Sequence, residues 1–206
     1  MKTLVLLFLS TMLALAGCKK STTDAPAPGS AAPTPAADAD RVEVLARHRP
    51  IASQEDLDAD PVVVQFHKFS VTKASFDPKN LEGGTATLEL DMASITSGSV
   101  ERDDDLKSPA FIDVGKFATA TINVANVKKQ TDTGYTADAT VALRGTTKTY
   151  PVRFEVLATT ADTVRIKGEH AFSRLDFSIG VDPANDPTER VDTGLTIQWV
   201  LTLKKS

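Results

Sequence analysis

The chain has 206 residues, 41% of them hydrophobic, which is enough to bury the core of one domain and leave further chain outside it. Its formal net charge of −4 offers no basic surface of the kind that nucleic-acid binding requires. The single cysteine excludes an internal disulfide and a thiolate metal cluster.

The start of the chain has the pattern of a secretion signal. Lys2 precedes an apolar run at residues 4–16, which is shorter than the roughly twenty residues that span a bilayer. The run ends in the letters LAGC at residues 15–18, which resemble the lipobox of bacterial lipoproteins. The resemblance implies a signal peptide at residues 1–17, acylation of Cys18, and attachment to a membrane by acyl chains.

The segment after the signal is predicted to be a disordered tether. Residues 18–40 carry Cys18 and are otherwise rich in Ala, Pro, Ser, Thr and Asp, with almost nothing apolar to bury. The reach of such a segment is on the order of 25 to 70 Å. Lys19 stands where some bacteria place an aspartate that retains lipoproteins in the inner membrane. We therefore expect the outer membrane, with the periplasmic or surface-facing side left open.

Residues 41–206 are predicted to form an all-β domain. Apolar and polar residues alternate in eight segments: residues 42–46, 62–76, 83–92, 117–127, 135–143, 150–156, 164–172 and 195–203. A period of two predicts strands with one buried face. Eight such strands joined mostly by short connections predict an antiparallel up-and-down barrel or a sandwich. The second segment changes phase between Phe66 and Phe69, which predicts a bulge or bend there.

Two connections carry further expectations. Residues 144–149 are predicted to be the turn of a hairpin formed by the fifth and sixth segments. The long connection at residues 93–116 contains Asp103, Asp104 and Asp105, one of which can cap a short helical turn, and Pro109 would limit that turn.

Five motifs carry a family resemblance. Residues 94–98 read SITSG, residues 102–108 RDDDLKS, residues 111–117 FIDVGKF, residues 143–148 LRGTTK and residues 173–180 SRLDFSIG. In order and spacing they resemble the YceI-like family, over about residues 61–204.

The resemblance implies a lipocalin-like, eight-stranded antiparallel barrel around an elongated apolar tunnel. In characterised members this tunnel holds a polyisoprenoid chain or an isoprenoid quinone. The chain departs from the family pattern at Asp105, where histidine is usual, at Ala118, where proline is common, and at Ser178, where glycine is common. The usual Asp and His-Ser pair of the first strand is not evident at residues 62–69.

Residues on the predicted inner face mix small and large side chains. An eight-stranded barrel of this size is either filled by side chains or holds one small ligand. Small residues can accommodate barrel taper or leave a cavity, and the resemblance favours the cavity. The predicted ligand-binding residues are Phe66, Leu88, Leu90, Ala120, Ile122, Ala137, Ala139, Val141, Phe154, Ile166, Phe172, Ile197 and Trp199.

No catalytic, metal or cofactor site is predicted. His48, His67 and His170 lack the spacing of metal ligands. His170 is expected to be a hydrogen-bonded core histidine, with a ligand contact as the alternative. The acidic run at residues 101–105 lacks the glycine and glutamate of an EF-hand loop. Arg174 and Asp176 are expected to pair at a strand corner, because no Gly-x-Ser-x-Gly elbow accompanies them.

Three functions remain after these exclusions. The first is a membrane-tethered carrier that sequesters or shuttles an isoprenoid-like lipid or quinone in the cell envelope, without a chemical step. The alternative is a filled barrel that acts as a structural or adhesion module through its outer surface and residues 93–116. An enzyme is a distant third. The identity of the lipid, its loading partner and the oligomeric state, a homodimer included, stay open.

Overall fold

The structure, a computed structural model, describes residues 39–49 and 61–205. The chain divides into two units, residues 1–31 and 32–206, and the fold and cavity below belong to the second. The signal peptide, Cys18 and nearly all of the tether lie outside the described residues. No helix in the described part combines the length and apolarity that crossing a membrane requires.

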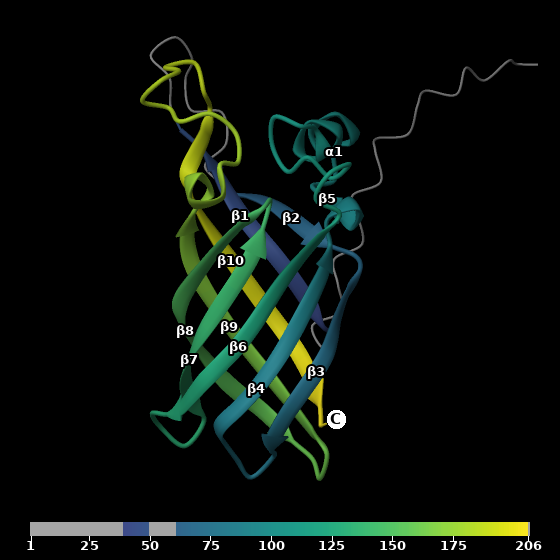
Figure 1. Cartoon of the computed structure of the whole chain (residues 1–206), viewed down its shortest axis with the longest axis vertical. Helices are drawn as coiled ribbons and strands as arrows, with labels where there is room; N and C mark the ends of the chain where they lie inside the picture. The colour runs from purple at the N-terminus through teal and green to yellow at the C-terminus, as the bar shows by residue number, and fades with distance from the viewer. Residues whose placement is uncertain (1–38, 50–60, 206) are drawn as a thin grey trace, which may run out of the picture. The chain divides into compact units, whose positions relative to one another are not determined.

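The second unit is built on one antiparallel sheet that curls around an apolar interior (Figure 1). Its ten strands are β1 (Arg41–His48), β2 (Val62–Phe66), β3 (Phe69–Asp77), β4 (Asn80–Asp91), β5 (Ile95–Thr96), β6 (Thr119–Lys129), β7 (Gly134–Leu143), β8 (Thr146–Thr159), β9 (Thr163–Ser173) and β10 (Val191–Lys204). They are ordered β3-β4-β6-β7-β8-β9-β10-β1-β2-β5. One α-helix, α1 (Val100–Lys107), and two 3₁₀ turns, η1 (Met92–Ser94) and η2 (Arg174–Phe177), interrupt the strands.

The prediction of eight strands is wrong in number. The second predicted strand divides into β2 and β3, which are separated only by His67 and Lys68, where the apolar phase changes. This confirms the predicted bend. The strand before the bend, β2, pairs with β1 and β5, whereas the strand after it, β3, pairs with β4. The two-residue β5 was too short to give a periodic signal. The structure is thus a ten-stranded curled sheet in place of the predicted eight-stranded barrel.

The hairpin of β7 and β8 has a tighter turn than predicted. Only Arg144 and Gly145 lie between the strands, with φ of 50° and 76°. Two central residues at positive φ are typical of the turn whose twist matches that of the flanking strands. Strand pairing therefore resumes at once, with Leu143 opposite Thr146, and β8 begins four residues earlier than the sequence suggested.

The end of the sheet that carries the β3–β4 and β6–β7 hairpins is packed shut. Leu81, Val127, Tyr135 and Val164 are all less than 9% exposed there. The rings of Tyr135 and Phe154 stack with centroids 5.5 Å apart. These side chains come from β4, β6, β7, β8 and β9 and pack in one cluster across this end of the interior.

Helix α1 is the predicted short helical turn of the long connection, but Ser99 and not an aspartate caps it. Asp103 lies inside the helix and reaches back to the preceding loop, where its carboxylate accepts hydrogen bonds from Thr96 Oγ1 and from Ser97 N and Oγ, each at 2.6 Å. Partial burial acts to raise the pKa of Asp103, but these hydrogen bonds outweigh it and the pKa is lowered. The helix ends at Lys107, before Pro109, as predicted.

Candidate ligand-binding cavity

The curled sheet encloses a cavity of about 200 Å³. All strands except β5 contribute to its wall, together with η1 and η2. An engineered protein cavity of about 150 Å³ lined by aliphatic side chains stays dry and takes up benzene, whereas pockets for drug-sized ligands begin at about 300 Å³. The cavity is therefore large enough for a small apolar group or a short length of hydrocarbon chain.

The wall carries no ionisable residue other than one tyrosine and one histidine. No Asp, Glu, Lys or Arg is among the described residues that line it. The polar side chains of the wall belong to Thr85, Thr87, Tyr150, His170 and Trp199. Thr87 is already engaged, because its Oγ1 donates to Asn123 Oδ1 at 2.9 Å. A guest would thus meet mainly aliphatic and aromatic surface.

Twelve of the thirteen residues predicted to bind a ligand line this cavity. They are Phe66, Leu88, Leu90, Ala120, Ile122, Ala139, Val141, Phe154, Ile166, Phe172, Ile197 and Trp199. Ala137 does not line it; this alanine is 3% exposed and packs in the core near the shut end. The period-two pattern thus identified the inner face, while the role of these residues as ligand contacts stays a prediction.

Sequence reasoning missed part of the wall. Val42 and Val44 of β1 lie on it, although their strand gave only a weak signal. Tyr150 and His170 occupy inward positions of β8 and β9, which the alternation could have shown. Phe177 comes from η2, outside any strand, so no periodic signal could have placed it there.

The indole ring of Trp199 lies over a glycine of the neighbouring strand. Gly168 is its partner across the β9–β10 pair. A Cβ at Gly168 would collide with the indole ring of Trp199 and come within 2.7 Å of the Arg153 carbonyl oxygen. The missing side chain therefore lets the largest residue of the wall lie against the sheet.

Aromatic rings gather at the η2 end of the cavity. The ring of Tyr150 lies 6.5 Å from that of Phe172 and 6.3 Å from that of Phe177. The Tyr150 hydroxyl donates a hydrogen bond to Asp176 Oδ2 at 2.8 Å. Burial and this carboxylate raise the pKa of Tyr150, so the phenol stays protonated at neutral pH. Its donor is thus already used within the protein.

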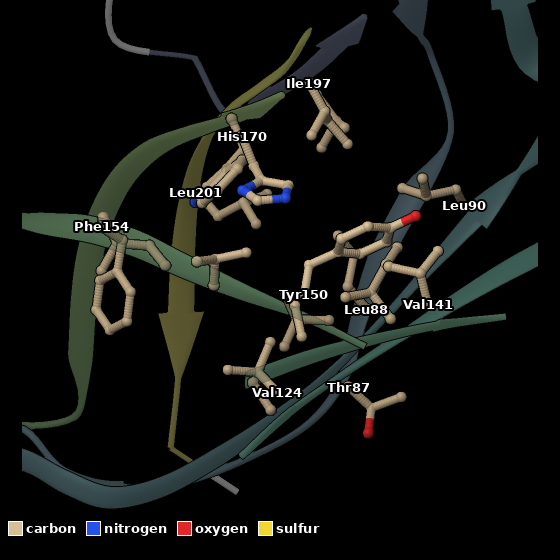
Figure 2. Close-up of a pocket in the computed structure, with 18 of the residues that line it drawn as sticks. Thr87, Leu88, Leu90, Val124, Val141, Tyr150, Phe154, His170, Ile197 and Leu201 are labelled. Atoms are coloured by element: carbon tan, nitrogen blue, oxygen red, sulfur yellow. The ribbon is translucent and has the colours of Figure 1, made fainter. Parts of the chain in front are cut away.

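His170 differs from the expected hydrogen-bonded core histidine. Its Nε2 is buried and has no hydrogen-bond partner within the described part of the chain. Figure 2 shows its ring beside that of Tyr150, among aliphatic side chains, and the two ring centroids lie 5.2 Å apart. Burial lowers the pKa of His170 below its ordinary value, so the imidazole is neutral at pH 7. The prediction of a hydrogen-bonded core histidine was wrong: the neighbouring Tyr150 directs its hydroxyl to Asp176, and the other side chains around the ring are mainly apolar.

Arg174 and Asp176 do not form the predicted pair. Arg174 is 1% exposed and donates to the carbonyl oxygens of Asp192, Ile179 and Val191 at 3.0, 2.7 and 2.9 Å. The carboxylate nearest to its guanidinium is that of Glu189, at 3.8 Å. Arg174 therefore stabilises the strand corner through backbone carbonyl groups between Ile179 and Asp192. Asp176 instead accepts the hydrogen bond of Tyr150.

These features define the class: a curled β-sheet domain with an apolar internal cavity, which is the architecture of a small-molecule binding site. The described residues contain no group of three or more His, Cys, Asp or Glu that could hold a metal ion. A sequence profile of the YceI-like domain matches residues 41–203, and the chain belongs to this family.

Similar proteins come from several bacteria. A UPF0312 protein of Yersinia enterocolitica is 37% identical over 81 residues, which cover 39% of this chain and 41% of that protein. A UPF0312 protein of Vibrio campbellii is 32% identical over 133 residues, 61% of this chain and 68% of that protein. The match thus spans less than half of the Yersinia relative and about two thirds of the Vibrio relative.

Solved structures share the fold. The structure of Burkholderia cenocepacia BcnA has a TM-score of 0.67 at 21% identity and covers 80% of this chain and 96% of its own. A polyisoprenoid binding domain of Saccharophagus degradans, implicated in plant cell wall breakdown, has a TM-score of 0.62 at 13% identity and covers 81% and 94%. At these identities the likeness shows the fold alone.

Proposed function

We propose that the protein binds an isoprenoid-like lipid, a polyisoprenoid or the tail of a quinone, in this cavity and sequesters or shuttles it without a chemical step. The observation that carries the proposal is the cavity of about 200 Å³, on whose wall the described residues include no Asp, Glu, Lys or Arg. Removing hydrocarbon from water is favourable by about 25 cal/mol per Å², so such a wall favours a prenyl chain. The Saccharophagus domain of similar fold, a polyisoprenoid binding domain, supports the same ligand class.

The volume limits how much of a chain the cavity holds. At about 200 Å³ it takes a short segment, so the rest of a long tail must extend beyond it or move the surrounding side chains. The alternative of a filled barrel that acts through its outer surface requires an interior without such a void. No observation on the outer surface favours it.

The proposal includes a membrane tether. The LAGC letters at residues 15–18 support acylation of Cys18, and residues 18–40 would hold the domain away from the lipid headgroups. With Lys19 next to Cys18, we propose the outer membrane of the cell envelope as the location. A lipid carrier anchored in this way would exchange its guest close to the membrane.

One experiment tests guest and tether together. The full chain is purified from membranes of its native host, and mass spectrometry is applied to its organic extract and to its N-terminal peptide. We expect a long-chain lipid in the extract and an acylated Cys18 at the N-terminus. If the folded protein carries no apolar molecule and takes up no added polyprenol, the carrier function is wrong, whereas an unmodified Cys18 overturns only the tether.

A further inference from the structure

The polar side chains of the cavity wall differ in whether they already have a hydrogen-bond partner. Among the polar side chains of the wall, those of Tyr150 and Thr87 already make hydrogen bonds to Asp176 and Asn123. Thr85 is exposed. His170 Nε2 is buried and unpartnered within the described residues. A buried polar atom without a partner costs about 1–3 kcal/mol, and such atoms are rare enough in folded proteins to call for an explanation.

We infer that His170 is the polar contact for the guest, and that the cavity selects an uncharged amphiphile whose hydroxyl or carbonyl oxygen hydrogen-bonds to the imidazole. The inference rests on the proposed function, which it deepens by naming the chemistry of the head group. A hydrogen bond from the guest, made by a turn of the imidazole that brings the buried nitrogen to the cavity, would remove the cost of the unpartnered atom. It would also fix the guest with its polar end at the η2 end and its hydrocarbon towards the shut end.

The protonation state of His170 fits a neutral head group. The lowered pKa keeps the ring uncharged at pH 7, so one ring nitrogen donates a hydrogen bond and the other accepts one. Such a ring can pair with a hydroxyl or a carbonyl. It supplies no positive charge to balance a phosphate or a carboxylate.

The charges around this end also disfavour an anionic head group. The nearby charged group is the carboxylate of Asp176 in η2, which accepts a hydrogen bond from the Tyr150 hydroxyl at 2.8 Å. Arg174, on the same turn, is committed to three backbone carbonyl groups and faces Glu189. No Lys or Arg is among the described residues of the cavity wall. A diphosphate would therefore lose its hydration without gaining a counter-ion.

The test compares three probes that share one prenyl chain: farnesol, the hydrocarbon farnesene and farnesyl diphosphate. The protein is the full chain with Cys18→Ser, so that acyl chains do not compete with the probe. Binding is followed by the fluorescence of Trp199, the single tryptophan of the chain and part of the cavity wall. We expect farnesol to bind about three- to tenfold more tightly than farnesene, the value of one hydrogen bond, and farnesyl diphosphate to bind most weakly.

Three variants assign the preference to His170. His170→Phe should bind farnesene as the parent does and lose the preference for farnesol. His170→Gln, which keeps a donor and an acceptor, should retain part of it and guards against a general packing effect. Lys167→Gln is the matched control on the same strand, because the Lys167 side chain is 51% exposed and pairs with Glu155 outside the cavity.

The outcomes separate this inference from the function on which it rests. If the parent binds farnesyl diphosphate as tightly as farnesol, or if His170→Phe keeps the preference for farnesol, the head-group inference is overturned and the carrier function stands. If none of the three probes binds, the carrier function fails and the inference falls with it.

Discussion

Ser178 is a residue with a side chain that adopts the left-handed backbone conformation. It follows η2 with φ of 54° and ψ of 39°, and its N–H donates to the carbonyl oxygen of Leu175 at 3.1 Å. The left-handed conformation costs a residue with a Cβ roughly 1–2 kcal/mol, whereas glycine adopts it freely. The conformation at this position therefore favours glycine over serine.

We predict that Ser178→Gly raises the free energy of unfolding by about 0.5–1 kcal/mol, because relief of the left-handed strain exceeds the added entropy of the unfolded chain. Urea unfolding monitored by circular dichroism measures the change. Ser178→Ala is the control, since alanine keeps the Cβ and should bring no gain. Equal stability of the two variants would mean that the backbone at this position is not strained.

At the residue scale, alternation predicted which side chains face inward but not their partners. Twelve predicted residues lie on the cavity wall because a strand's side chains point to opposite faces in turn. Tyr150 finds its partner in η2, and Arg174 finds its partners at Ile179 and at the first two residues of β10, which a strand period does not predict. For the same reason the unpartnered state of His170 could not be predicted.

At the element scale, η2 is held to the sheet by one buried side chain. Arg174 donates to the backbone of Asp192, Val191 and Ile179, and the backbone of Ile179 returns a hydrogen bond to the Arg174 carbonyl oxygen at 3.1 Å. These bonds fix the start of β10 against the turn that carries Asp176. The polar end of the cavity therefore depends on this arginine, although it does not line the cavity.

We predict that Arg174→Met lowers the free energy of unfolding by about 3–5 kcal/mol, because three backbone carbonyl groups, that of Ile179 fully buried, and Glu189 lose their partner. Urea unfolding measures this change. Arg153→Met on the outer face of β8 is the matched control and should change stability by less than about 0.5 kcal/mol. A similar small effect for both variants would show that the corner forms without the guanidinium.

The boundaries of strands were predictable where the apolar alternation changes phase. They were not predictable where a turn places a residue other than glycine at positive φ. The phase change after Phe66 predicted the bend between β2 and β3. The two-residue turn at Arg144 and Gly145 was missed, because only glycine of this pair is typical of positive φ. The cap of α1 was not predicted, because the three consecutive aspartates and Ser99 are all residue types that cap helices, and the aspartates were chosen.

At the scale of the whole domain, the sequence predicted an all-β fold but not the extent of its cavity. Strand alternation gives the direction of a side chain, whereas the free volume depends on how side chains from several strands meet. Small residues such as Ala120 and Ala139 fit equally with a filled taper and with a void. The structure decides for a void of about 200 Å³.

The void makes a prediction that a solid interior does not share. Ala139 is 6% exposed, lines the cavity, and lies between Val124 and Tyr150 of the neighbouring strands. Ala139→Leu should extend into free space, so we expect the free energy of unfolding to change by less than about 1 kcal/mol. In a well-packed core the same enlargement costs about 1–3 kcal/mol.

Binding and stability should therefore separate in this variant. We expect Ala139→Leu to weaken farnesol binding at least about tenfold, about 1.4 kcal/mol, because the added side chain occupies the volume that the guest needs. Ala142→Leu is the matched control on the exposed face of the same strand and should alter neither quantity. Trp199 fluorescence and urea unfolding measure the two effects on one sample. Strong destabilisation with unchanged binding would show that the interior is filled and that the guest binds elsewhere.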